Sequence, residues 1–328
     1  MGLIHMKNFK FVVKRPAGLP VERAEYLTYY NYDVEKIRQL VDYICADTDF
    51  TKYRKRELIL DWFMTVDTET STLPPGSSDQ YPDAYLSFAY LYQIRLGNCN
   101  ILIRNRHDFR AFVDQVAGIL NGKGITLVAY VHNLSFEWQF FKSILAVDRD
   151  SVFAIQARRI AKFTTNGGAI EWRCSYLLSN MSLEKFAENY APPQFRKDKE
   201  LIDYEVIRYP WTLLSGEILY YSIMDVVSLE ASIKELLSRE GDNLKTIPLT
   251  NTGYVRRDGR RACLGDNTKH YRSKEEKGSY LPFLLYRRMF CKTALTLAQY
   301  RILCDAFRGG NTHANRFFRR ADPPGSGR

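Results

Sequence analysis

A chain of 328 residues, 45% of them hydrophobic and 26% charged, has the composition of an ordinary globular protein and is long enough to bury a large core. We expect neither a membrane span nor a secretory leader, because no apolar run approaches the roughly 20 residues that cross a bilayer and Met1–Lys10 has no apolar core. The six cysteines form no CxxC pair and the net charge is +10, which predicts a basic, cytoplasmic protein with reduced thiols.

Residues 1–56 are predicted to form an accessory N-terminal segment ahead of the main domain. Within this segment, apolar residues recur at helical spacing over Val34–Cys45, which predicts an amphipathic helix. Nothing in its sequence indicates what the segment does.

Between residues 57 and 240, predicted strands and helices alternate. The predicted strands are Leu58–Val66, Ala84–Ile94, Asn100–Ile103 and Ile125–Val131, and then a hairpin across Ser151–Arg173 that turns at Asn166, Gly167 and Gly168. The predicted helices are His107–Leu120, one that begins just after Val131, Ser182–Tyr190 and about Leu213–Ser238. Ser71–Asp83, rich in Ser, Pro, Gly and Asp, is predicted to be a loop. The alternation predicts an α/β domain with a central mixed sheet flanked by helices.

The C-terminal part, residues 241–321, is predicted to be a basic, partly helical extension, with a disordered tail at 322–328. Pro248–Asp266 has the composition of a connector, and helical sequence resumes near Tyr280. Residues 251–328 contain 17 Lys or Arg against 6 Asp or Glu, a balance of +11, so the first 250 residues sum to −1. This asymmetry favours a polyanion partner, although a merely solvated basic surface has the same charge.

The first chemical motif is Asp67-Thr68-Glu69, directly after a predicted apolar strand. Because side chains alternate along a strand, Asp67 and Glu69 are expected on the same face. Two carboxylates on one face repel each other unless a cation or a proton lies between them. Such pairs are common by chance, so this motif alone is weak.

The second motif, from His132 to Glu137, follows the predicted buried strand Ile125–Val131. Asn133 is a candidate N-cap for the helix that starts there, which is its structural interpretation. Glu137 lies four residues further on, in the first turns of that helix. The carboxyl end of a central strand is where α/β sheets bind ligands, so an acid here is a candidate site residue.

The third motif is Tyr221 with Asp225, inside the longest predicted helix. At spacing i, i+4 the two side chains share a helix face, and their neighbours on that face are mainly apolar. An unpaired carboxylate among apolar side chains is costly to bury, and a metal ion would remove that cost. A simple Tyr–Asp pair at a surface edge is the alternative interpretation.

In this order, the three motifs resemble the Exo I, Exo II and Exo III motifs of the DEDD exonucleases, and the tyrosine is similar to that of their tyrosine-bearing subgroup. More closely, the chain resembles the N-terminal exonuclease region of protein-primed, phage-type family B DNA polymerases. The resemblance spans about Leu58 to Phe318 and implies a ribonuclease H-like exonuclease fold. It also implies that the basic extension contains the start of the polymerase palm region.

Three further segments carry the resemblance. Ser175 matches a Ser/Thr-Leu motif, with Tyr176 where the family usually has Leu. Lys199, five residues before Tyr204, matches the family's catalytic-site lysine. The run Phe307-Arg308-Gly309-Gly310 resembles a Tyr-x-Gly-Gly motif that links the exonuclease and polymerase parts, with Phe in place of Tyr. Glu137 also departs from the family, which usually has Asp there.

The resemblance implies a two-metal-ion site for hydrolysis of 3′-terminal phosphodiesters. The implied metal ligands are Asp67, Glu69, Glu137 and Asp225, and their hard oxygens favour two Mg²⁺ or Mn²⁺ ions. Tyr221 would orient the attacking water, and Lys199 would place a positive charge near the scissile phosphate. The residues implied to hold DNA are Thr70, His132, Asn133, Phe136, Ser175, Phe307, Arg308, Gly309 and Gly310.

The expected partner is the 3′ end of single-stranded DNA, and a terminal protein or the missing polymerase half are further candidates. The motifs of DNA synthesis do not follow Gly310, so we expect a chain truncated before them and without polymerase activity. If the gene is phage-encoded, the expected location is the host cytoplasm. Three alternatives remain: a catalytically inactive nuclease-fold module that binds DNA or a replication partner, a ribonuclease of the same superfamily, and a non-enzymatic basic binding protein.

Overall fold

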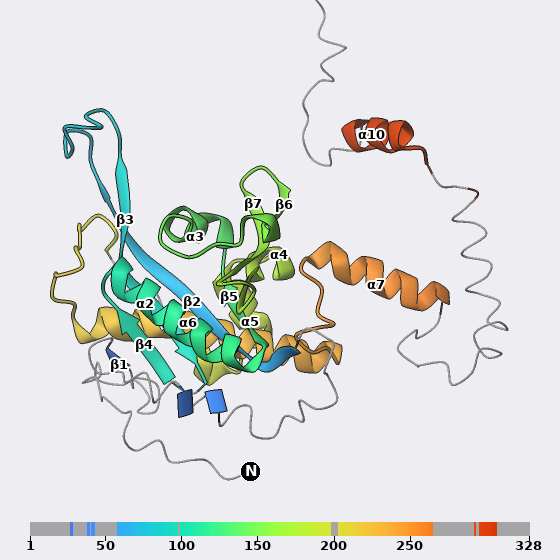
Figure 1. Cartoon of the computed structure of the whole chain (residues 1–328), viewed down its shortest axis with the longest axis horizontal. Helices are drawn as coiled ribbons and strands as arrows, with labels where there is room; N and C mark the ends of the chain where they lie inside the picture. The colour runs from blue at the N-terminus through green and yellow to red at the C-terminus, as the bar shows by residue number, and fades with distance from the viewer. Residues whose placement is uncertain are drawn as a thin grey trace, which may run out of the picture. The chain divides into compact units, whose positions relative to one another are not determined.

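The computed structural model describes residues 27–28, 38–39, 41–42, 58–97, 99–197, 203–264, 292 and 295–306. The chain divides into two compact units, Met1–Tyr254 and Val255–Arg328 (Figure 1). All the strands that the structure describes belong to the first unit.

The first unit is organised around one eight-stranded sheet with the order β1-β4-β3-β2-β5-β8-β7-β6. Its strands are β1 (Leu27–Thr28), β2 (Leu58–Leu73), β3 (Leu86–Leu96), β4 (Cys99–Ile103), β5 (Ile125–Val131), β6 (Phe153–Gln156), β7 (Arg159–Thr165) and β8 (Ile170–Cys174). β2 runs antiparallel to β3 and parallel to β5, and β5 runs parallel to β8. The mixed sheet confirms the predicted α/β fold with a central mixed sheet.

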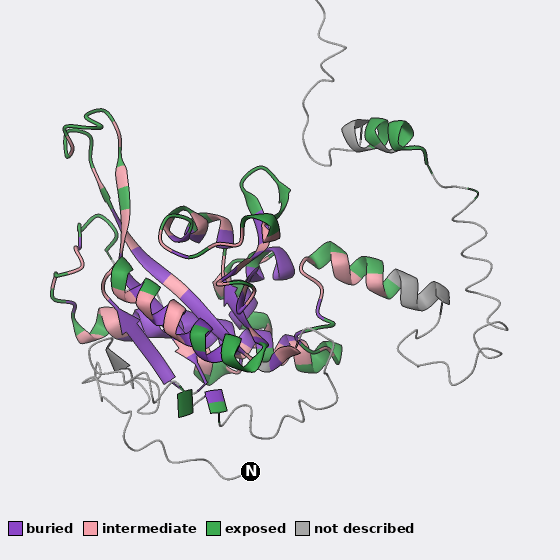
Figure 2. Cartoon of the chain, viewed as in Figure 1, coloured by how far each residue is buried: buried purple, intermediate pink, exposed green. Residues whose placement is uncertain are grey.

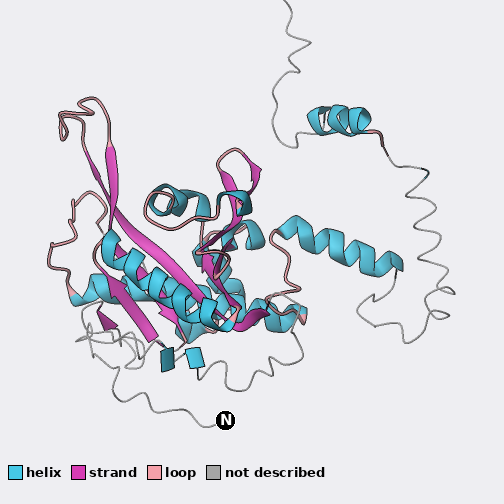
Figure 3. Cartoon of the chain, viewed as in Figure 1, coloured by secondary structure: helices cyan, strands magenta, loops and turns pink. Residues whose placement is uncertain are grey.

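Helices cover both faces of this sheet (Figure 3). The helices of the first unit are α2 (Arg106–Lys123), α3 (Leu134–Phe141), α4 (Ser175–Ser179), α5 (Leu183–Tyr190) and α6 (Gly216–Glu240). The long helix α6 begins where the Ser215 hydroxyl accepts a bond from the Ile218 amide, and it ends at Gly241 with a positive φ of 62°. The first unit also contains two short 3₁₀ turns, Arg149–Ser151 and Pro193–Phe195.

The two faces of β2 enter two different hydrophobic cores, which Figure 2 shows as the buried centre of the sheet. Met64 and Val66 lie in the larger core, with Phe109 of α2 and Trp172 of β8. Phe63 lies in the core that contains residues of α5 and α6. The continuous apolar run of β5 follows from its central position, because both of its faces are covered.

The structure differs from the predicted elements in two places. Pro248–Asp266, predicted to be a connector, contains helix α7 (Asn251–Leu264), and the boundary between the two units lies within it. The Thr250 hydroxyl accepts a hydrogen bond from the Gly253 amide at 3.2 Å and so caps the N-terminus of this helix. A threonine directly before the first helical residue was the sequence signal for it. The loop predicted at Ser71–Asp83 starts later, because β2 continues to Leu73 opposite Leu86 of β3.

Several predictions fall on residues outside the described part of the chain. Of the helix predicted at Val34–Cys45, residues 38–39 and 41–42 are described and helical. The helical start near Tyr280 and the tail at 322–328 lie outside; the second unit contains most of α7 and, further on, α10 (Leu297–Ala306). Within the described ranges, no helix is both long enough and apolar enough to cross a membrane.

Candidate active site

The two acids of the first motif share the face of β2 that packs against α6. On that face, Phe63 joins the core with α6, and Thr65 Oγ1 donates a 2.8 Å hydrogen bond to the Val226 carbonyl. Alternation along the strand directs Asp67 and Glu69 to the same side. Glu69 is buried, whereas Asp67 is half-buried.

The third acid of the cluster comes from α6. Asp225 is buried, as is Tyr221 one turn earlier on the helix. One carboxylate oxygen from each of Asp67, Glu69 and Asp225 lies within 4.8 Å of the other two. The fold thus brings the first and third predicted motifs together, and we refer to these three residues as the acidic cluster.

Burial and mutual repulsion make the acidic cluster hard to ionise. Burial raises the pKa of Asp67 well above its usual range, and Asp225, Glu137 and Glu69 raise it further. Burial, reinforced by Asp225, raises the pKa of Glu69 to about 7. The hydroxyl of Ser222 and the amide of Gln93 donate to Glu69 and partly oppose this rise.

A lysine that the sequence reasoning missed lies against the cluster. Lys197 Nζ donates to both carboxylate oxygens of Asp225, at 2.6 and 2.8 Å, and lies 3.2 Å from the centre of the Tyr221 ring. The lysine lowers the pKa of Asp225, which burial raises. The sequence signal was the basic pair Arg196-Lys197, since Lys197 lies two residues before Lys199, the lysine that was predicted. Lys199 itself lies outside the described residues.

The acid of the second motif lies near the cluster without joining it. Glu137, in the first turn of α3, is 3% exposed and its carboxylate accepts a hydrogen bond from the Thr68 hydroxyl. Burial raises the pKa of Glu137 to about 8, although the bond from Thr68 lowers it. Glu137 is close enough to Asp67 to raise the pKa of that acid as well. The structure therefore places the fourth predicted ligand beside the cluster, held by Thr68.

The residues that precede Glu137 present polar and aromatic groups to solvent. Asn133 occupies the N-cap position of α3, as predicted, but its side chain makes no capping bond and its backbone is left-handed, with φ 58°. Such a conformation is uncommon for a residue other than glycine. Phe136 is 41% exposed and packs edge-on against Phe140 with ring centres 5.5 Å apart. Both exposed side chains are available to a ligand.

His132 and Ser175 form a buried link between β5 and α4. His132 Nδ1 lies 3.0 Å from the Ser175 hydroxyl, which in turn donates to the Val131 carbonyl at 3.2 Å. Ser175 is fully buried, and burial lowers the pKa of His132 to about 4, so this ring is neutral near pH 7. The pair supports the backbone on which Asn133 is presented.

The remaining predicted residues are placed as follows. Thr70 is half-buried and follows Glu69 across a bulge in the pairing of β2 with β3. Phe307, Arg308, Gly309 and Gly310 lie outside the described residues. Tyr204, which the sequence reasoning used only to place Lys199, is hydrogen-bonded to Tyr221.

The residues present fit a divalent cation. Three carboxylates with raised pKa values converge within ligand distance of one another, and the ammonium of Lys197 already stands against one of them. Carboxylate oxygens are the ligands that Mg²⁺ and Mn²⁺ prefer. The fold and the site thus define a candidate carboxylate-based cation site on one face of a mixed α/β sheet.

No family of protein sequences matches the chain, and no curated protein is similar to it in sequence. Among solved structures, Phi29 DNA polymerase complexed with primer-template DNA and incoming nucleotides is similar over 78% of this chain and 40% of that one, with 14% identity and a TM-score of 0.48. The catalytic core of RRP6 from Trypanosoma brucei is similar over 71% of this chain and 51% of that one, with 14% identity and a TM-score of 0.34. The Aedes aegypti Nibbler EXO domain is similar over 63% of this chain and 87% of that one, with 13% identity and a TM-score of 0.30. The chain spans about 40% of the length of the polymerase.

The stability of the metal-free protein is expected to fall as the pH rises from 5 to 9. Folding raises the pKa of Glu69 from 4.5 to about 7 and that of Glu137 from 4.5 to about 8, so the folded state favours the protonated forms. Their contribution is fully present below the unfolded pKa of 4.5 and is lost as the pH rises through 7 and 8. Mn²⁺ should raise the melting temperature more at pH 8.5 than at pH 5.5, because it binds the ionised acids.

Calorimetry at both pH values, with EDTA or Mn²⁺, measures this effect. The Glu69→Gln variant is the control for all other titrating groups. In EDTA, its melting temperature should depend less on pH than that of the parent. Equal Mn²⁺ effects at the two pH values would contradict the assignment of a cation site to these acids.

Proposed function

We propose that this chain is a metal-dependent 3′–5′ exonuclease that removes nucleotides from single-stranded DNA, and that it corresponds to the proofreading part of a phage-type DNA polymerase. The observation that carries the proposal is the convergence of Asp67, Glu69 and Asp225 beside Tyr221. A phosphodiester cannot be hydrolysed by carboxylates that repel it, so a cluster of acids at a DNA site requires cations.

The acidic cluster would hold the divalent ions, and Glu137 would complete the set. Bound Mg²⁺ or Mn²⁺ supplies a water nucleophile at neutral pH and neutralises charge on the leaving oxygen. To take part, Glu137 would have to exchange its bond with Thr68 for a place near Asp67, whose pKa it already raises. Lys197 neutralises Asp225 when no ion is bound and is free to approach the scissile phosphate when Asp225 is engaged.

The other residues of the site would bind and orient the reactants. Tyr221 lies on the same helix face as Asp225 and its bond with Tyr204 fixes its hydroxyl, which suits it to orient the attacking water. Asn133 and Phe136 are exposed beside Glu137, where an amide and a ring would hold the terminal nucleotide by hydrogen bonding and stacking. Thr70 lies next to Glu69 on the same strand, and His132 and Ser175 support Asn133 from behind.

The basic residues of 251–328 would strengthen DNA binding through contacts with phosphates. A terminal protein or a polymerase half are the protein partners that this function implies, and a host cytoplasm is the location that it implies. We do not expect this chain by itself to synthesise DNA.

One pair of contacts favours a second candidate, an inactive nuclease-fold module that binds DNA or a replication partner. Lys197 stands where a cation belongs, and Glu137 is bonded to Thr68 rather than placed in the cluster. A module without catalytic activity could satisfy these buried carboxylates through such contacts, with no metal ion. The two candidates differ in one respect, because only the enzyme gains activity when divalent metal is added.

The test is digestion of a single-stranded DNA oligonucleotide that carries a label at its 5′ end. The proposed function gives a descending ladder of labelled products in Mn²⁺ and none in EDTA, and a 3′-phosphate end slows the reaction. A matched RNA oligonucleotide should be degraded more slowly, whereas faster cleavage of RNA would favour the ribonuclease alternative. Binding without cleavage in either metal would establish the inactive module.

A further inference from the structure

Three aromatic rings form a stack that the catalytic proposal does not use. Phe88 of β3 packs face to face with Tyr209, with ring centres 5.6 Å apart and an angle of 16° between the rings. Tyr209 in turn packs against Trp211, at 5.0 Å and 4°. Phe88 is half-buried and Trp211 is 79% exposed, so the stack runs from the sheet out to solvent. We call these three residues the aromatic stack.

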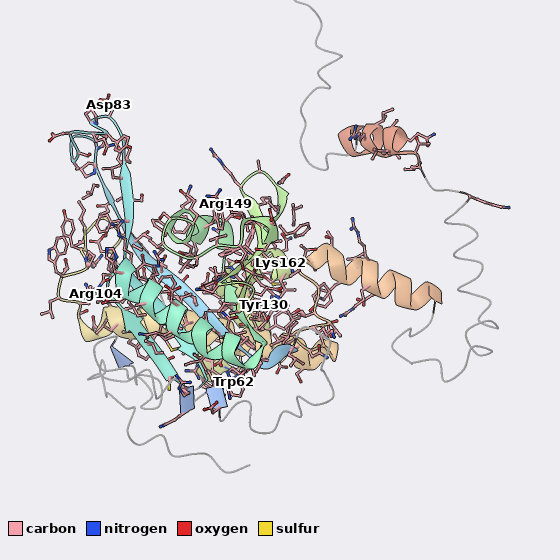
Figure 4. The ribbon with its side chains drawn as sticks, in the orientation of Figure 1. Trp62, Asp83, Arg104, Tyr130, Arg149 and Lys162 are labelled. Atoms are coloured by element: carbon pink, nitrogen blue, oxygen red, sulfur yellow. The ribbon has the colours of Figure 1, made fainter. Side chains whose placement is uncertain are left out.

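The backbone beneath the stack is held firmly by an arginine. The Arg104 guanidinium donates to the Tyr209 carbonyl at 3.0 Å and to the Thr212 carbonyl at 2.7 Å, and it also donates to the Tyr90 carbonyl of β3. The Thr212 hydroxyl accepts a 2.8 Å bond from the Tyr209 amide. Figure 4 labels Arg104 on the side of the sheet where this segment runs. An outward-facing tryptophan on a fixed backbone is preorganised for binding, since little freedom remains to be lost.

The stack is continuous with the acidic cluster. Ser71 lies two residues beyond Glu69 on the same face of β2, a separation of about 6.6 Å along the strand. Ser71 pairs with Phe88 across the sheet, and its hydroxyl accepts a bond from the Arg208 amide at 2.9 Å. The segment that carries the stack therefore begins at Tyr204, beside Tyr221, and crosses the strand just past the acids.

We propose that the aromatic stack binds a base of single-stranded DNA upstream of the 3′-terminal nucleotides. The inference rests on the proposed function, which places the 3′ end at the acidic cluster. A flat, exposed indole at the end of a column of parallel rings presents an open π face, and every base can stack on it regardless of sequence. The stack would thus extend the site by one base and make the enzyme prefer strands long enough to reach it.

The test uses the full chain in EDTA, where no cleavage occurs, with the oligothymidylates dT3 and dT12 as probes. The parent should bind dT12 more tightly than dT3. In Trp211→Ala this preference should shrink about tenfold, the size expected for one lost stacking contact. The Trp211→Phe variant retains a stacking ring and should keep most of the preference. The Leu213→Ala variant is the matched control, because Leu213 is 95% exposed on the same segment outside the stack.

Tryptophan fluorescence supplies a second readout. Trp172 is buried and Trp62 and Trp138 are half-buried, so Trp211 is the indole best exposed to a base among the described residues. Quenching by dT12 in the parent should largely disappear in Trp211→Phe although binding remains. An unchanged preference for dT12 in Trp211→Ala overturns the proposal, as does a parent that binds no dT12. Equal weakening by Leu213→Ala also overturns it, because the loss would then not depend on stacking against Trp211.

Failure of the proposed function is distinguishable from failure of this site. A parent that binds dT12 through Trp211 but cleaves nothing in Mn²⁺ refutes the exonuclease and leaves the stacking site in place. If the Trp211→Ala variant cleaves dT12 as fast as the parent and binds it as tightly, the stacking site is refuted and the exonuclease is left in place.

Discussion

Replacement of both Asp67 and Glu69 by alanine is expected to reduce the release of mononucleotides from single-stranded DNA at least about 10³-fold, which corresponds to roughly 4 kcal/mol of transition-state stabilisation. These residues supply two of the three carboxylates that each place one oxygen within 4.8 Å of the others. Without them Asp225 remains as the one acid of the cluster, and it is already neutralised by Lys197. The measurement is the initial rate of nucleotide release in saturating Mn²⁺.

The variant should nevertheless fold, which separates lost chemistry from lost structure. Burial and repulsion raise the pKa of both residues, so their ionised forms destabilise the metal-free protein at pH 8. The double variant should therefore melt at a higher temperature than the parent in EDTA at that pH. Asp79→Ala with Asp83→Ala is the matched control, because both acids are exposed in the loop between β2 and β3, where Figure 4 labels Asp83. A parent-like rate in the cluster variant would remove the basis of the proposed function.

The Glu137→Ala variant is expected to lose about 100-fold or more in cleavage rate, whereas Glu137→Asp should stay within about tenfold of the parent, in either direction. Glutamate has one more rotor than aspartate, and ordering that rotor costs a fraction of a kcal/mol. Removal of the carboxylate instead deprives the site of its fourth acid. Rates are measured across a Mn²⁺ titration, so that weaker binding of the ion is separated from slower chemistry. If the alanine variant followed the parent through that titration, Glu137 would be a buried structural acid.

The hydroxyl of Thr68 offers an independent test of the same residue. Thr68→Val keeps the shape of the side chain and removes the donor of the bond to Glu137. That bond lowers the pKa of Glu137, which burial raises to about 8, so its loss should raise this pKa further. The rate of the valine variant should therefore fall below that of the parent more at pH 7 than at pH 9. An equal effect at both values would show that Thr68 does not act through the ionisation of Glu137.

The order of the elements and the local geometry of two motifs could be predicted from the sequence. The run Ile125–Val131 is a strand with the predicted bounds, and the hairpin turns where Asn166, Gly167 and Gly168 all adopt positive φ. Both predictions depend on backbone preferences and burial patterns that act within a few residues. The pairing of Asp67 with Glu69 and of Tyr221 with Asp225 follows in the same way from the periods of the strand and the helix.

Only the tertiary structure decided what these local pairs meet. The contact of Lys197 with Asp225, the bond between Thr68 and Glu137, and the column of Phe88 with Tyr209 each join residues that have no regular spacing in the sequence. Thr68 and Glu137 illustrate the reason. Thr68 was passed over between two acids because strand alternation turns it away from them, and α3 happens to place Glu137 on that other side. Periodicity determines which face a side chain takes, whereas the packing of helices on the sheet determines its partner there.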